Sequence, residues 1–100
     1  MIHVIAVITA KKGKRPELLD AFSRIVPLVH AEQGCIEYQP VVDAENAGEA
    51  QAMLGPDTYV VVEKWESMND LNAHSVSPHM VEFGKTAGDL VADRKIHILS

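Results

Sequence analysis

"IHVIAVITA", residues 2–10, is the stretch from which the fold of this chain can be worked out. It is a nearly uninterrupted run of β-branched and small apolar residues, and it ends at the turn Lys11-Lys12-Gly13. A short run of this composition, bounded by a turn, is typical of a β-strand. Because side chains on a strand alternate between two faces, apolar residues at almost every position predict that both faces of this strand are covered.

A helix is expected after this strand, beginning near Pro16, which the first turn of a helix tolerates. Apolar residues then recur at helical spacing as far as Val29, which predicts a helix of about four turns. Pro27 falls inside it on the polar face, so we expect a kink there and not a break. Gly34 follows, a residue suited to the left-handed conformation in which many helices end.

Further elements follow from composition and turn signals. Pro40 restricts its strand to a sheet edge or a bulge. Ser67 with Asp70 resembles a capping box, and Ser77-Pro78 is typical of a second helix start. The expected elements are a strand at 35–42, a loop at 43–57 with room for one helical turn at 49–53, a strand at 58–65, a short helix from Ser67, a helix from Pro78 and a short strand at 95–99.

This order is β-α-β-β-α-β, the ferredoxin-like arrangement of the α+β class, in one domain spanning residues 1–100. Helices cover only one face of such a sheet, so the second apolar face of residues 2–10 would meet water. Packing that face against a second copy removes the problem. The sequence therefore predicts a homodimer.

Composition narrows the possible functions. The 100 residues are 47% apolar and 23% charged, as in a globular protein. A net charge of −5, with one short basic cluster (Lys11, Lys12, Lys14, Arg15), argues against nucleic-acid binding. Residues 2–10 lack the basic flank and cleavage site of a signal peptide, and no stretch predicts a membrane span. The single cysteine, Cys35, fits a reducing compartment, so we expect a cytoplasmic protein in which Cys35 is a buried apolar side chain.

Several motifs along the chain resemble the antibiotic biosynthesis monooxygenase family, and within it the bacterial quinol monooxygenases. They are Lys11-Lys12-Gly13-Lys14, the segment Phe22 to Pro27, Glu32-x-Gly34-Cys35, Met53-x-x-Pro56-Asp57, Glu63-x-Trp65-Glu66-Ser67 and His74-x-x-x-Pro78-His79-Met80. The resemblance implies a dimeric α/β barrel that oxidises a quinol or related polyphenol, such as a naphthohydroquinone, with molecular oxygen. It also implies that no flavin, haem or metal takes part.

Such a reaction asks the protein for an apolar slot, exclusion of water and a group that takes a phenolic proton. Imidazole, with an unperturbed pKa near 6.5, suits the proton step, which makes His74 and His79 the candidate catalytic residues. Trp65, Glu63 and Tyr38 are candidates for substrate binding, as an aromatic wall, a carboxylate that orients a histidine, and a second aromatic. Each has a structural alternative. These are helix packing for His74, a surface or structural role for His79, a core position for Trp65, pairing with a lysine or arginine for Glu63, and ordinary packing for Tyr38.

No cofactor is expected. The glycines form no phosphate-binding loop, and His74 and His79 are five residues apart across a proline, a poor metal arrangement without a located carboxylate. Haem-degrading relatives carry an asparagine, a tryptophan and a histidine where this chain has Ala6, His74 and Gly84, so haem breakdown is not expected. A small-molecule binding or isomerase-like signal-processing module of the same fold remains the alternative to an oxygenase.

Overall fold

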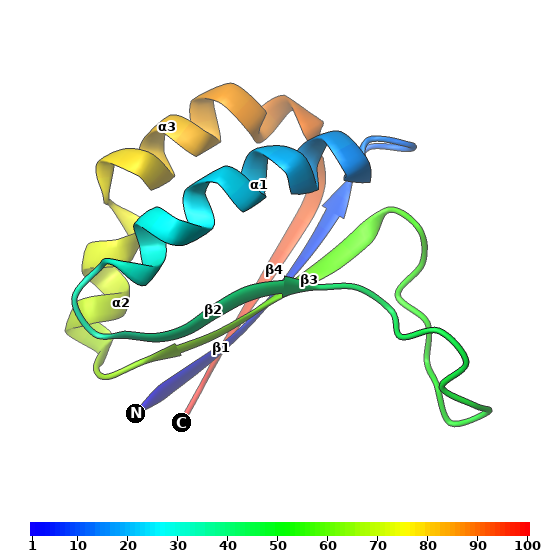
Figure 1. Ribbon diagram of the computed structural model, residues 1–100, viewed down its shortest axis with the longest axis horizontal. Helices are drawn as coiled ribbons and strands as arrows, with labels where there is room; N and C mark the ends of the chain where they lie inside the picture. Colours follow the sequence, from blue (N-terminus) through cyan, green and yellow to red (C-terminus); the bar gives the residue numbers. More distant parts are fainter.

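The computed structural model describes residues 1–100, which form one four-stranded sheet with helices on one of its faces (Figure 1). The elements, in chain order, are β1 (Ile2–Ala10), α1 (Arg15–His30), β2 (Cys35–Val41), β3 (Thr58–Trp65), α2 (Met68–Ser75), α3 (Pro78–Ala87), the 3₁₀ turn η1 (Gly88–Leu90) and β4 (Val91–Leu99). None of the helices is long and apolar enough to cross a membrane.

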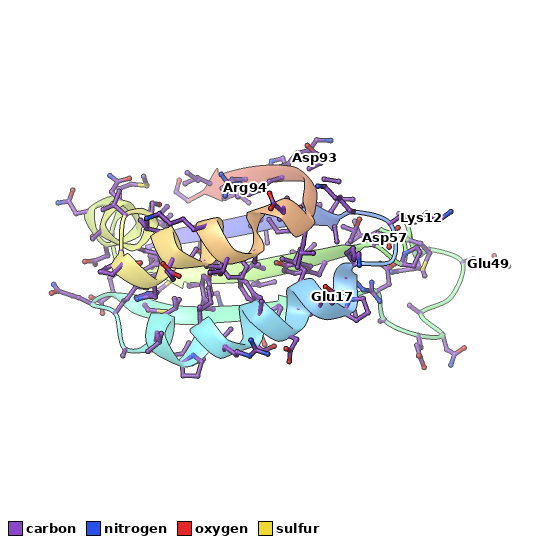
Figure 2. The ribbon with its side chains drawn as sticks, turned by 90° about the horizontal axis from the view of Figure 1, so that it is seen from above. Lys12, Glu17, Glu49, Asp57, Asp93 and Arg94 are labelled. Carbon is purple, nitrogen blue, oxygen red and sulfur yellow. The ribbon has the colours of Figure 1, made fainter.

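The sheet is antiparallel throughout, with the strand order β2-β3-β1-β4. This confirms the predicted α+β, ferredoxin-like arrangement, with the short helix α2 added before α3. β2 is an edge strand, so Pro40, which has no backbone N–H, leaves no central hydrogen bond unmade. Viewed from the helix side, α1 and α3 run next to each other roughly along the strands, and β4 lies at the sheet edge beyond α3 (Figure 2).

The side chains of strand β1 alternate between buried and half-buried, although its sequence is apolar at almost every position. Val4, Ala6, Ile8 and Ala10 are buried beneath the helices, whereas the residues between them are only half-buried. The buried face joins aromatic and aliphatic side chains from α1, β2 and β3 in a single core. The opposite face, whose centre is Ile5, Val7, Val60 and Val62, is covered by no helix of this chain.

One predicted boundary was wrong, and one optional helical turn did not form. β4 begins at Val91, four residues before the predicted 95, and pairs with β1 along almost its full length. Residues 91–94 were missed because β4 is an exposed edge strand, so no apolar alternation marks its first half. The loop after β2 contains no helical turn, and the Asp43 carboxylate instead accepts hydrogen bonds from the backbone N–H groups of Leu54 and Gly55.

Three local predictions were confirmed, and together they place the turn after α1 against α2. α1 continues through Pro27 without a break, and Gly34 has φ +80°. The Gly34 carbonyl accepts a hydrogen bond of 2.9 Å from the Glu66 N–H, and a Cβ at Gly34 would lie 2.1 Å from a side-chain oxygen of Asp70. Ser67 caps α2 by accepting from the Asp70 N–H. The close approach at Gly34 sets how near the end of α1 comes to α2.

Candidate active site

A cavity of about 560 Å³ lies between the helices and the inner face of the sheet. This volume is in the range of small-molecule sites. Thirteen of the twenty residues around it are hydrophobic. The polar or aromatic ones described below are Tyr38, Tyr59, Glu63, His74 and Arg94. The space is therefore suited to a flat apolar molecule with a few polar atoms.

His74 is the histidine that the structure places on this cavity. It lies near the end of α2, with a side chain only 6% exposed, and its ring packs 4.7 Å from Trp65 and 5.2 Å from Tyr38, centre to centre. Its Nδ1 atom lies 2.9 Å from Oε2 and 3.2 Å from Oε1 of Glu32. The imidazole is therefore held on two sides by aromatic rings and on a third by a carboxylate.

Glu32 also binds the second candidate histidine. His79, in the first turn of α3, places Nε2 2.6 Å from the same Oε2 atom, and Ser77 Oγ lies 3.2 Å from that nitrogen. His79 does not line the cavity, so the two histidines differ in position although they share one carboxylate.

Glu32 was not among the site residues predicted from sequence, although it begins the motif Glu32-x-Gly34-Cys35. Two hydrogen bonds hold its backbone: the Glu32 N–H donates to the Val29 carbonyl, and the Glu32 carbonyl accepts from the Cys35 N–H. The signal available in the sequence was a carboxylate two residues before a helix-ending glycine. Only the packing of that turn against α2 shows that it meets a histidine 42 residues away.

The Glu32 contact sets the tautomer of His74. A carboxylate accepts hydrogen bonds, so Nδ1 carries the hydrogen and Nε2 of the neutral ring is left as the acceptor. Nε2 makes no hydrogen bond within the chain, and no fully buried side-chain nitrogen or oxygen lacks a partner, so Nε2 keeps access to open space. His74 thus offers a proton acceptor at an apolar cavity.

Trp65 and Glu63 lie on the inner face of β3, as the strand alternation predicted. Trp65 is fully buried and stands behind His74 without lining the cavity. Its Nε1–H donates to Glu63 Oε1 at 2.9 Å, and Glu63 does line the cavity. Burial raises the pKa of the Glu63 carboxyl, opposed by the Trp65 hydrogen bond and by nearby His74. The cavity wall thus contains a carboxyl group whose ionised form is destabilised by burial.

Replacing Glu63 by glutamine is expected to stabilise the fold at neutral pH. A raised pKa means that the folded chain holds this proton more tightly than the unfolded chain, so ionisation of Glu63 weakens folding above the folded pKa. Glutamine can still accept the Trp65 hydrogen bond without the charge. Thermal unfolding should show a higher midpoint for Glu63→Gln at pH 7 and no gain below about pH 3, where the wild-type carboxyl is protonated in both states. A gain that persists unchanged at acid pH would show that charge is not the cause.

Two tyrosines complete the aromatic part of the site. Tyr38 stacks on Phe22 with ring centres 5.5 Å apart, and its hydroxyl points to Met80 Sδ at 4.0 Å, a weak contact. Tyr59, which sequence reasoning did not single out, is buried, lines the cavity and makes no side-chain hydrogen bond. Burial raises the pKa of both hydroxyls well above the ordinary value, so both remain neutral. Tyr59 therefore offers a hydroxyl to a bound molecule.

Arg94 is the one cationic side chain around the cavity, and it was also missed from sequence. It lies on β4, opposite Ile8 in the register, and forms no ion pair in the chain (Figure 2). Its segment was not predicted to be a strand, so nothing indicated which face it would occupy. Arg94 marks the open edge of the cavity, whereas Glu63 and His74 mark its buried part.

Cys35, expected to be buried, is half-buried, beside the acidic groups of the site. Burial, and then the charges of Glu32 and Glu63, raise the pKa of its thiol to about 11. Alkylation by iodoacetamide at pH 8 should therefore be about 100-fold slower than for an ordinary cysteine, because only the thiolate reacts. The same chain unfolded in urea is the control. Equal rates in the folded and unfolded chains would contradict the raised pKa and leave a reactive thiol at the site.

Comparison with known proteins agrees with this architecture. The family model described as "Antibiotic biosynthesis monooxygenase" matches residues 1–86. "Probable quinol monooxygenase YgiN" of Escherichia coli K12 is 40% identical over 101 aligned positions, which cover 99% of this chain and 96% of that protein. The protein of the same name from Shigella flexneri has the same identity and coverage.

Solved structures show the same fold at lower identity. PA3566 from Pseudomonas aeruginosa superposes with a TM-score of 0.80 at 24% identity, covering 98% of this chain and 90% of that one. A crystal structure of an antibiotic biosynthesis monooxygenase gives 0.82 at 20% identity, covering 100% and 97%. With the family model and a full-length relative in agreement, this chain belongs to the antibiotic biosynthesis monooxygenase family.

Proposed function

We propose that this protein oxidises a quinol or related polyphenol, such as a naphthohydroquinone, with molecular oxygen and without a cofactor. The observation that carries the proposal is His74, an imidazole with a free Nε2 at an apolar cavity and a carboxylate on its Nδ1. The name of the 40% identical relative supports the substrate class.

In this proposal the first step is proton transfer from a quinol hydroxyl to Nε2 of His74. The imidazolium that forms is stabilised by the Glu32 carboxylate at 2.9 Å, which is the reason for a charged group behind a buried ring. The substrate, now a phenolate, is the better electron donor to oxygen. The apolar walls exclude bulk water from the ionised substrate, and we propose that the Tyr59 hydroxyl, which also lines the cavity, donates to its second oxygen.

The working form is proposed to be a homodimer in the cytoplasm. The uncovered face of the sheet carries Ile5, Val7, Val60 and Val62 at its centre, and ion pairs at its margins, such as Lys64 with Glu37 at 3.2 Å. An apolar centre with a polar rim is the usual composition of a protein interface. A second copy of the chain offers the same face in return, as a two-fold interface requires.

The direct test is oxygen consumption by metal-stripped protein mixed with a naphthohydroquinone that has been prepared without oxygen. We expect uptake well above the spontaneous rate, from colourless protein and in the presence of a chelator. Mass analysis of the product under ¹⁸O₂ then separates incorporation of oxygen from simple electron transfer. Binding of the quinol without oxygen uptake would instead favour a binding or isomerase-like module, and activity that needs added iron, copper or flavin would contradict cofactor independence.

A further inference from the structure

Glu32, His74 and His79 bring three metal-ligating side chains to one point. They come from the turn after α1, from α2 and from the start of α3, and their nearest ligand atoms all lie within 4.8 Å of one another. Two of the three separations, 2.9 Å and 2.6 Å, are hydrogen bonds to the same carboxylate oxygen. Sequence spacing argued against a metal because no carboxylate could be located, and the structure places that carboxylate between the two histidines.

The donor set is one that divalent transition metals bind. Two imidazole nitrogens and a carboxylate are the three protein ligands of many zinc enzymes, with a water at the fourth position. Zinc bonds of about 2.0–2.1 Å in a tetrahedron put ligand atoms about 3.3–3.4 Å apart. The two separations from the carboxylate oxygen are shorter than that value and the third is no more than 4.8 Å, so the three side chains would move apart or together by at most about 1.5 Å to receive the ion.

The cluster is open to the outside of the molecule, apart from the cavity. The side chains of His79 and Glu32 are 20% and 14% exposed and do not line the cavity, whereas His74 is 6% exposed and does. An ion therefore has a route from the surface between the α1 turn and the start of α3. The Ser77 hydroxyl, 3.2 Å from His79 Nε2, is an additional oxygen at this place.

We propose that Glu32, His74 and His79 bind one divalent transition-metal ion, with Zn²⁺ as the reference ion, and that the bound ion inhibits the reaction at His74. A metal on Nδ1 displaces the hydrogen from that nitrogen, so a neutral ring must carry its hydrogen on Nε2. Nε2, the nitrogen without a partner in the chain, then donates and no longer accepts. The metal also takes the Glu32 carboxylate, which would otherwise stabilise the imidazolium. The inhibition rests on the proposed function, whereas the metal binding does not.

Binding is tested first, by calorimetric titration of Zn²⁺ into the metal-stripped full chain, with Co²⁺ absorption as a report of geometry. We expect one ion per chain, and at least about 100-fold weaker binding for His79→Ala and Glu32→Gln, since loss of an outer-sphere partner alone costs 10–100-fold. His97→Ala removes an exposed histidine of β4 and should bind as the wild type does. Absence of binding, or equal binding by all four proteins, overturns the site.

Inhibition is tested by oxygen consumption with and without Zn²⁺, each protein being compared with itself. Wild type and His97→Ala should lose activity with Zn²⁺ and regain it with a chelator. If His79→Ala retains measurable activity, Zn²⁺ should not change that activity. If the variant is inactive, the binding comparison alone decides the site. Zn²⁺ that binds without effect, or that activates, overturns the inhibition. Failure of the proposed function appears separately, as metal-stripped wild type that never consumes oxygen although Zn²⁺ binds.

Discussion

His74→Ala is expected to lower the turnover number by at least about 100-fold, the usual effect of losing a general base. The substitution removes Nε2, the acceptor at the cavity, and leaves the apolar walls in place. The loss should fall on kcat more than on KM, because in the proposed mechanism His74 accepts the proton and contributes little of the apolar contact. Steady-state oxygen consumption with a naphthohydroquinone, corrected for the spontaneous rate, measures it.

A packing role for His74 makes a different prediction, and His74→Asn separates the two. The asparagine amide can donate to Glu32 from nearly the position of Nδ1, so it preserves that hydrogen bond while removing Nε2. We expect His74→Asn to be as inactive as His74→Ala but closer to wild type in thermal stability. If His74→Asn keeps most of the activity, His74 is not the base, and the substrate's own acidity or another group must account for the reaction.

Val62→Asp is expected to convert the proposed homodimer into a monomer at micromolar concentration. Val62 pairs with Ile5 on the uncovered face of the sheet, and a two-fold interface would place two such carboxylates out of water. Burying unpaired charges costs several kcal/mol, so we expect association weakened by at least about 1000-fold, equal to roughly 4 kcal/mol. Light scattering at a series of protein concentrations measures the mass.

The matched control is Val81→Asp, the same chemical change at an exposed position on α3, on the other side of the sheet. It should leave the mass unchanged. Circular dichroism shows whether Val62→Asp remains folded; if it does not, Val60→Lys tests the same face with a longer side chain. The proposed interface would be contradicted by a wild-type chain that is already monomeric at micromolar concentration, or by dissociation with Val81→Asp alone.

The predicted order of elements was confirmed because each element has a local cause. Strand β1 follows from its β-branched run, α1 from helical spacing, its end from Gly34 at φ +80°, and the start of α2 from the Ser67 cap. These are preferences of a residue and its near neighbours, so one sequence suffices to read them. β4 shows the limit, since an exposed edge strand carries no apolar alternation at residues 91–94.

The candidate site likewise has a part that the sequence indicated and a part that only the structure showed. The residue types of the 63–80 segment by themselves indicated where proton chemistry and aromatic walls could lie, and Tyr38, Glu63 and His74 do meet at one cavity. Nothing local indicated that Trp65 stands behind His74, or that Glu32 binds both histidines across more than 40 residues. Those contacts depend on how the α1 turn packs against α2 and α3. The sequence by itself determined the family, the order of elements and the stretch that holds most of the candidate site residues; only the tertiary structure decided which nitrogen of His74 is free, because that depends on a partner distant in the chain.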